Sequence, residues 1–158
     1  MPAQFPASSR LVLLERIADP GNLGTIIRTV EALGFDGLIF LGEHVSPYNA
    51  KTLRASMGSA LFLKLYEAEN LTLVKKLLQG LRLYTADMGG TPLSNFLTCS
   101  QAEDRKKFYD CGFALLLGNE AHGVSEEAKA LCDCLISIEM QGEAESLNLA
   151  AAAAILSW

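Results

Sequence analysis

The chain has 158 residues, of which 50% are hydrophobic, and a formal net charge of -5 at pH 7. This length is enough for one domain with a core on both faces of a sheet. No apolar stretch approaches the roughly 20 residues of a membrane helix, and residues 1–9 lack a signal-peptide pattern. We therefore expect a single cytoplasmic domain over residues 1–158.

The charges are distributed unevenly along the chain. Residues 1–66 carry six basic and five acidic side chains, whereas residues 67–158 carry seven and thirteen. A polyanion should therefore bind the first half, although the basic excess is too small to hold nucleic acid by bulk charge alone. The four cysteines lack the spacing of zinc ligands, so we expect reduced thiols and no metal.

The first forty residues predict a βαβ unit. Residues 11–17 form an apolar run that ends in a turn signal over 18–21, and apolar side chains then recur at helical spacing up to Leu33. Gly34 ends this helix, and residues 37–41 are short and apolar, as a buried parallel strand should be.

Strands and helices continue to alternate in the rest of the chain. Further strands are expected over residues 60–66, 81–86, 113–117 and 135–138, and helices over 50–56, 70–79, from Ser125 onward, and in the alanine-rich C-terminal segment. Residues 87–92 are expected to form a loop, and residues 100–107 a solvated connection. This order predicts an α/β protein with a mostly parallel sheet covered by helices on both faces. The chain stops inside an apolar helix, which leaves open that the natural protein extends further.

Three polar clusters stand at expected strand-to-helix junctions, where open α/β sheets bind ligands. They cover residues 22–28, 118–123 and 145–150. Each has a plain structural explanation, with Asn22 and Ser146 as helix caps, Arg28 facing solvent and Glu120 organising a turn. The functional explanation is that the Arg28 guanidinium holds a phosphate and that the helix start near Ser146 favours an electron-rich group.

The second cluster has the glycine spacing of a phosphate-binding loop. However, Val124 and Ser125 follow where Lys-Ser or Lys-Thr is required, and no GxGxxG follows the first strand. Nucleoside triphosphates and NAD are therefore disfavoured. What remains is a turn bounded by glycines that lets a ligand approach the backbone.

Taken together, the clusters resemble those of the SpoU (TrmH) family of RNA ribose methyltransferases, in the SPOUT class. The resemblance covers nearly the whole chain and runs through Asn22-x-Gly24-x3-Arg28, Arg54-Ala55-Ser56-x-Gly58, Gly118-Asn119-Glu120-x2-Gly123 and Glu145-Ser146-Leu147-Asn148. It implies an α/β fold whose C-terminal part is a trefoil knot, a rare exception to the rule against threaded chains. It also implies a SPOUT methyltransferase domain that works as a homodimer. Many relatives carry an extra N-terminal RNA-binding domain or basic terminal extensions, whereas here we expect one SPOUT domain without a separate RNA-binding domain.

The reaction implied by the resemblance is methyl transfer from S-adenosyl-L-methionine to a ribose 2′-hydroxyl of tRNA or rRNA. The implied catalytic residues are Arg28, Asn22, Glu120, Ser146 and Asn148, with Asn22 and Arg28 approaching the cofactor of the partner subunit. The implied cofactor contacts are Gly118, Ile138, Leu147, Asn119, Met140 and Ala86. The basic side chains available for RNA are Arg10, Arg28, Lys51, Arg54 and Lys64.

Proposals for the family give the role of base to the residue that matches Arg28. Because a guanidinium has a pKa above about 12, it is a poor base, and we expect Arg28 to hold the phosphate and polarise the hydroxyl. The family usually has proline after Ile138, where this chain has Glu139. The alternatives are a non-catalytic RNA-binding module with the same fold, and a flavodoxin-like binder of small molecules without a knot.

Overall fold

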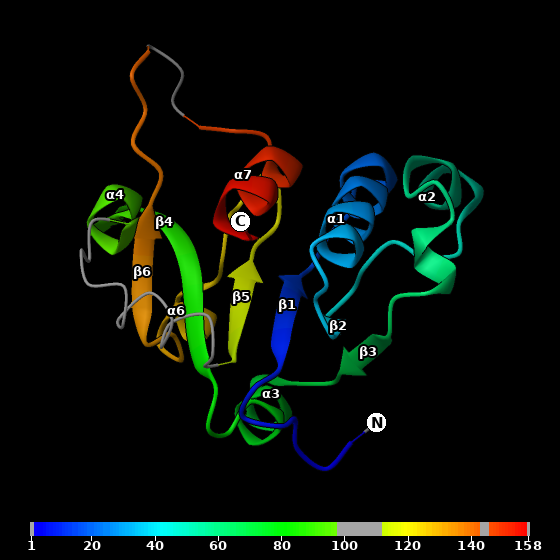
Figure 1. Cartoon of the computed structure of the whole chain (residues 1–158), viewed down its shortest axis with the longest axis horizontal. Helices are drawn as coiled ribbons and strands as arrows, with labels where there is room; N and C mark the ends of the chain where they lie inside the picture. The colour runs from blue at the N-terminus through cyan, green and yellow to red at the C-terminus, as the bar shows by residue number, and fades with distance from the viewer. Residues whose placement is uncertain (1, 98–111, 143–145, 158) are drawn as a thin grey trace.

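Six parallel strands form one sheet in the order β3-β2-β1-β5-β4-β6 (Figure 1). The computed structural model describes residues 2–97, 112–142 and 146–157. The strands are β1 (Arg10–Glu15), β2 (Gly37–Leu41), β3 (Leu65–Ala68), β4 (Arg82–Pro92), β5 (Phe113–Leu117) and β6 (Cys134–Ser137). The sheet confirms the predicted α/β class and its parallel strands.

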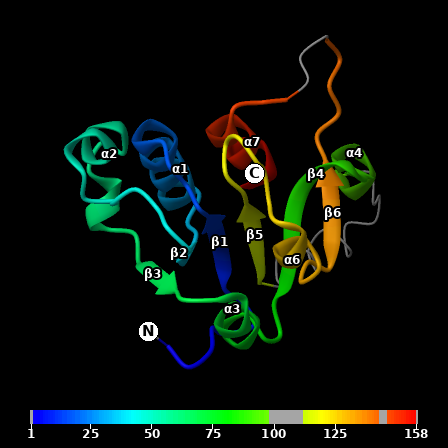
Figure 2. The same cartoon turned by 180° about the vertical axis from the view of Figure 1, so that it is seen from behind.

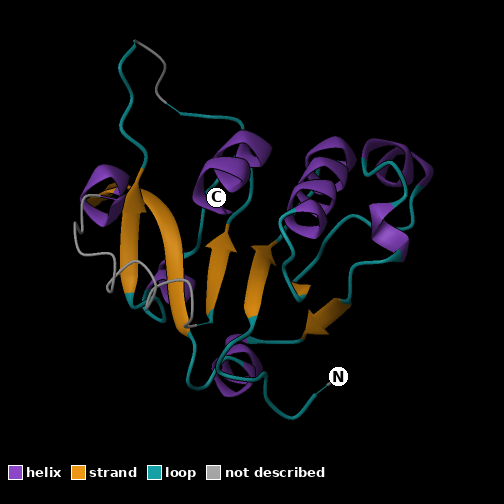
Figure 3. Ribbon diagram, in the orientation of Figure 1, coloured by secondary structure: helices purple, strands orange, loops and turns teal. Residues whose placement is uncertain are grey.

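Helices cover both faces of this sheet (Figures 2 and 3). They are α1 (Pro20–Ala32), α2 (Ala50–Ala55), the 3-10 helix η1 (Ser59–Leu61), α3 (Leu71–Leu77), α4 (Leu93–Leu97), α6 (Glu126–Lys129) and α7 (Leu149–Ser157). Helices α1 and α7 pack on one face, and α3 and α6 on the other. None of the helices in the described residues is long and apolar enough to cross a membrane.

Strands β1, β2 and β5 are almost continuously apolar because both faces of the sheet are buried there. Along β1, Val12 and Leu14 belong to the core beneath α1 and α7, whereas Leu11 and Leu13 belong to the opposite core. All four side chains are fully buried. The alternation follows from the two-residue period of a strand.

Helix α1 begins earlier than its apolar pattern indicates. Asp19 is the N-cap, since its side chain accepts a hydrogen bond from the N–H of Asn22 (2.7 Å), and Pro20 occupies the first turn. The interpretation of Asn22 as a helix cap is therefore wrong. This leaves the Asn22 side chain available for other contacts.

Two strand predictions need correction. The strand expected over residues 60–66 begins only at Leu65, because η1 occupies part of that segment. Residues 87–92, expected to form a loop, belong to β4, which continues after a register shift against β6 between Ala86 and Thr91. Gly90 makes this possible, since a Cβ there would lie 2.6 Å from the backbone of Leu135.

The other expected elements agree with the structure to within a few residues, and β5 has the predicted bounds. The solvated connection expected over residues 100–107 lies outside the described residues. The trefoil knot stays a prediction, because the connection from β6 to α7 includes residues 143–145, which also lie outside them.

Candidate functional site

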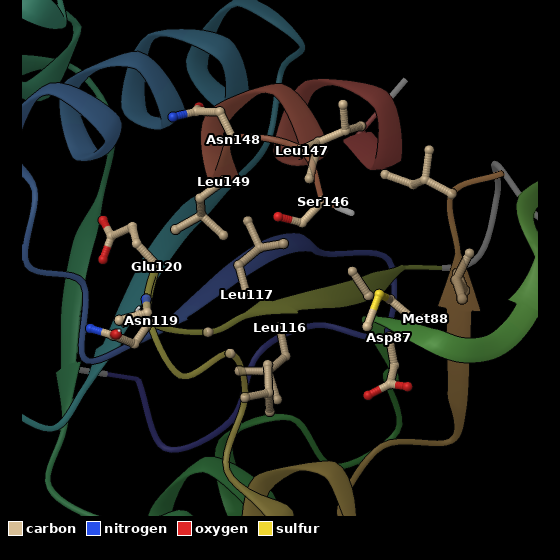
Figure 4. A pocket seen from close by; sticks show the side chains of 18 of the residues that line it. Asp87, Met88, Leu116, Leu117, Asn119, Glu120, Ser146, Leu147, Asn148 and Leu149 are labelled. Carbon is tan, nitrogen blue, oxygen red and sulfur yellow. Dashed lines mark hydrogen bonds between the residues drawn. The ribbon is translucent and has the colours of Figure 1, made fainter. Parts of the chain in front are cut away.

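A cavity of about 690 Å³ opens at the carboxyl ends of β5 and β6 and beside Ala86, Asp87 and Met88 in the middle of β4 (Figure 4). Its walls also include the loop after β5, the segment before α7, and the side chains of Asn22 and Lys129. Ligands bind at this edge of open parallel sheets. Within the described part of the chain, no group of three His, Cys, Asp or Glu residues could hold a metal ion.

The loop after β5 is closed by its own backbone. The N–H of Asn119 donates to the carbonyl of Gly123 (2.9 Å), and the N–H of Gly123 donates back to the carbonyl of Asn119 (2.8 Å). A Cβ at Gly118 would collide with the backbone of Gly123 and Val124. The predicted glycine-bounded turn is therefore confirmed, and its backbone lines the cavity.

Residues from all three polar clusters meet at one side of the cavity. Asn148 donates from Nδ2 to Oδ1 of Asn22 (2.9 Å), and Asn22 donates from Nδ2 to Oε1 of Glu120 (3.3 Å). Glu120 also accepts from the backbone N–H groups of Ala18 (3.5 Å) and Asp19 (3.2 Å). The network joins the start of α1, the loop after β5 and the start of α7.

Asn148, rather than Ser146, caps helix α7. Its Oδ1 accepts from the N–H groups of Ala150 (2.9 Å) and Ala151 (3.4 Å). Ser146 is exposed and lines the cavity, as Figure 4 shows. The hydroxyl of Ser146 is thus available to a ligand, and the interpretation of this residue as a helix cap is wrong.

Arg28 does not share the cavity that Asn22 lines. It is exposed on α1 and lines a second, smaller cavity of about 450 Å³ with residues that include Leu33, Ala55 and Ala154. The described part of the chain gives its guanidinium no hydrogen bond or ion pair. Asn22, by contrast, lines the cavity of its own chain. The resemblance places both Asn22 and Arg28 at the site of the partner subunit.

The six residues expected to contact the cofactor all line the larger cavity. They are Ala86, Gly118, Asn119, Ile138, Met140 and Leu147. Asn119 has a further structural role, since its Nδ2 donates to the carbonyl of Arg16 (2.8 Å). Glu139 is exposed and is not among the lining residues.

Sequence reasoning missed an ion pair in the cavity wall. Lys129 Nζ lies 2.7 Å from Oδ2 of Asp87 and 3.0 Å from Oε1 of Glu126. The hydrogen bonds from Lys129 and from the N–H of Gly89 lower the pKa of Asp87. The sequence signal for this pair is the position of Asp87 directly after the expected strand 81–86, although the same pattern predicts a loop from Asp87 onward.

A second missed group is the buried carboxylate of Glu15 at the end of β1. It accepts from the N–H of Ser125 (2.8 Å), from the Ser125 hydroxyl (2.7 Å) and from Arg16 (2.9 Å). Burial alone would raise the pKa of Glu15, but these hydrogen bonds together lower it. Ser125 also caps α6 as predicted, by accepting from the N–H of Ala128.

The basic side chains expected at an RNA surface have different surroundings. Arg10 is engaged inside the fold, where its guanidinium donates to the carbonyls of Leu33 (3.2 Å) and Ser157 (3.5 Å) and lies 4.5 Å from the ring centre of Phe35. Lys51 Nζ lies 3.7 Å from Oδ2 of Asp19, while the side chains of Arg54 and Lys64 are exposed. Arg10 is thus a structural residue here.

Known proteins are similar to this chain in both sequence and structure. The 23S rRNA (guanosine(2553)-2'-O)-methyltransferase RlmP of Bacillus subtilis is 36% identical over 159 residues, which cover 99% of this chain and 60% of that protein. The 23S rRNA (uridine(2479)-2'-O)-methyltransferase of Streptomyces viridochromogenes is 37% identical over 150 residues, which cover 92% of this chain and 50% of that protein. The chain therefore spans about half to three fifths of the length of these relatives.

Two solved structures have the same fold. An AdoMet-bound rRNA methyltransferase from Sinorhizobium meliloti matches with a TM-score of 0.83 and 31% identity, over 98% of this chain and 56% of that one. The SpoU methyltransferase AviRb from Streptomyces viridochromogenes, in complex with AdoMet, matches with a TM-score of 0.82 and 30% identity, over 98% and 57%. The model of the SpoU rRNA Methylase family matches residues 9–158. The chain accordingly belongs to the SpoU rRNA Methylase family, which confirms the resemblance found in its motifs.

Proposed function

We propose that this chain is the catalytic domain of an S-adenosylmethionine-dependent RNA 2′-O-ribose methyltransferase. The observation that carries this proposal is the hydrogen-bonded network of Asn22, Glu120 and Asn148 at a cavity bounded by the Gly118 loop. The two relatives named above are 23S rRNA 2'-O-methyltransferases, which favours rRNA over tRNA as the substrate. Such a substrate fits a cytoplasmic protein.

The cavity fits S-adenosylmethionine in size and in chemistry. Its volume of about 690 Å³ lies within the range of small-molecule sites. Ala86, Ile138 and Leu147 provide an apolar wall for an adenine ring, and the space that Gly118 leaves lets a ligand lie against backbone N–H and C=O groups. Asn119 and Met140 would complete the contacts.

Bound S-adenosylmethionine would supply the sulfonium methyl group for in-line transfer to the ribose oxygen. Within the chain, Glu120 accepts from two backbone N–H groups and from Asn22, and thereby fixes the amide of Asn22. Asn22 in turn fixes Asn148 at the start of α7. The exposed Ser146 hydroxyl is free to orient the nucleotide.

The position of Arg28 supports a homodimer. A guanidinium on the exposed face of α1, which does not line its own chain's larger cavity, would reach such a cavity if another copy of the chain places its own there. In this arrangement Arg28 holds the RNA phosphate next to the partner's cavity. Lys51 and Arg54, on the neighbouring α2, would extend the RNA contact.

Calorimetric titration with S-adenosylmethionine and S-adenosylhomocysteine, together with the oligomeric mass in the same buffer, tests the proposal. We expect saturable binding at one site per chain of a dimer. A folded dimer that binds neither compound would contradict the catalytic assignment and favour the RNA-binding module without catalysis. A monomer that binds both would contradict only the dimer.

A further inference from the structure

The cavity has a second polar side, which the proposed mechanism does not use. Asp87 lies across the pocket from Asn119 and Glu120, as Figure 4 shows, and Lys129 lies beside Asp87. Both side chains are 25% exposed, so the pair is partly buried and still accessible from the cavity. The mechanism proposed above gives this pair no part in binding the nucleotide that accepts the methyl group.

The Asp87 carboxylate is fixed but not saturated. Its Oδ1 accepts from the N–H of Gly89 (2.9 Å), and its Oδ2 accepts from Nζ of Lys129 (2.7 Å). An ionised carboxylate offers about four acceptor positions, so about two remain for a ligand. The bonds from Lys129 and Gly89 also lower the pKa of Asp87, which keeps the group ionised at neutral pH.

The position of Asp87 limits which donor it can meet. It directly follows Ala86, which lines the apolar wall with Ile136 and Ile138. In an adenosyl group the ribose is bonded directly to the adenine. An adenine packed on that wall therefore brings the 2′- and 3′-hydroxyls of its attached ribose to the edge of the wall, where a carboxylate is a suitable acceptor.

We propose that Asp87 accepts hydrogen bonds from the ribose hydroxyls of the adenosyl cofactor, and that Lys129 is a positioning residue that fixes the carboxylate. This inference rests on the proposed function. Glu126 offers a matched control, because it binds the same Lys129 ammonium but is 86% exposed and is not among the residues that line the cavity.

The test is calorimetric titration of the wild type, Asp87→Ala and Glu126→Ala with S-adenosylhomocysteine and with its 2′-deoxy and 3′-deoxy analogues. Loss of a hydrogen bond to a charged group predicts that Asp87→Ala weakens binding of S-adenosylhomocysteine by about ten- to a hundredfold. Glu126→Ala should leave the affinity close to that of the wild type. For at least one deoxy analogue, Asp87→Ala should reduce the affinity much less, because that analogue already lacks the hydroxyl that Asp87 would bind.

The outcomes separate the ribose from other donors. If Asp87→Ala weakens all three ligands by the same factor, the carboxylate does not bind a ribose hydroxyl, and the inference is wrong. A contact between Asp87 and the α-ammonium group, which all three ligands carry, would give this result. Asp87→Asn keeps the shape of the side chain and provides a second variant if the alanine variant unfolds. Its loss of affinity should be smaller and should depend on the ribose hydroxyls in the same way.

The same data distinguish this inference from the proposed function. A wild-type protein that fails to bind S-adenosylhomocysteine contradicts both. Normal binding by the wild type with an unchanged affinity of Asp87→Ala contradicts the ribose contact alone and leaves the proposed function in place.

Discussion

Glu15 is a buried carboxylate that the fold keeps ionised. It is 5% exposed, and burial without partners would favour its neutral form. Ser125 supplies two hydrogen bonds and Arg16 a third, and together these lower the pKa of Glu15. Because Ser125 caps α6 directly after the loop that lines the cavity, Glu15 also ties that loop to the end of β1.

Glu15→Gln should therefore destabilise the protein at neutral pH by about 1–3 kcal/mol, since the amide keeps only one acceptor oxygen for these donors. The pKa of Glu15 is lower in the folded state. Its contribution to stability is thus complete above the ordinary glutamate pKa of about 4.3 and is lost as the pH falls through the lowered folded value. Urea unfolding at pH 7 and at successively lower pH measures both effects.

The control for this prediction is Glu43→Gln, because Glu43 is exposed. Its free energy of unfolding should match the wild type throughout the pH range. A difference between wild type and Glu15→Gln that stays constant as the pH falls below 4 would contradict the linkage to Glu15 ionisation.

At the scale of elements, the loop from Gly118 to Gly123 depends on a close backbone approach. A side chain at Gly118 would collide with backbone atoms of Gly123 and Val124, which are not flexible side-chain ends and cannot move alone. Gly118→Ala should therefore displace the whole loop, at a cost of about 1–3 kcal/mol in the free energy of unfolding. Affinity for S-adenosylhomocysteine should fall at least tenfold, as calorimetry can measure.

Gly142→Ala is the matched substitution. A Cβ at Gly142 would meet no atom of the described residues within 4 Å, and its φ is not in the left-handed region. Stability and affinity should both stay near the wild-type values. Wild-type affinity in Gly118→Ala would mean that the loop backbone does not line the cofactor site.

The sequence predicted those helices and strands whose local residue preferences favour the same conformation as their packing in the fold. The βαβ start and β5 were found because their apolar runs are buried on both faces of the sheet. The second half of β4 was missed because Gly89, Gly90 and Pro92 favour a loop locally. Pairing with β6 overrides this preference, and no local pattern encodes that contact.

The site was predictable to a similar degree. The motifs marked Asn22, Glu120 and Asn148 as site residues. The resemblance placed Asn22 at the partner's cofactor, whereas the structure joins all three in one network within one chain. Asp87 and Lys129 were missed because they lie 42 residues apart and share no motif. The inward placement of Arg10 could not be anticipated either, since its partners Leu33 and Ser157 accept through backbone carbonyls, which any sequence provides.

At the scale of the whole molecule, the proposed site is divided between two copies of the chain. Asn148 lines the cavity, while Arg28 lies on α1 at the separate, smaller cavity. Each variant, Arg28→Ala or Asn148→Ala, should lose methyl transfer to unmodified ribosomal RNA. Arg28→Ala should keep its affinity for S-adenosylhomocysteine, since Arg28 does not line the cavity.

A mixture of the two inactive variants distinguishes the arrangements. In a symmetric dimer with shared sites, a heterodimer combines one chain's intact Asn148 with the other chain's intact Arg28. Random exchange of subunits at equal concentrations should then restore roughly one quarter of the wild-type activity. The activity is measured as radiolabelled methyl groups transferred from S-adenosylmethionine to the RNA.

If Arg28 serves the cavity of its own chain, every site in the mixture lacks one residue. A mixture as inactive as its components, after exchange has been verified by mass, would therefore exclude the shared site.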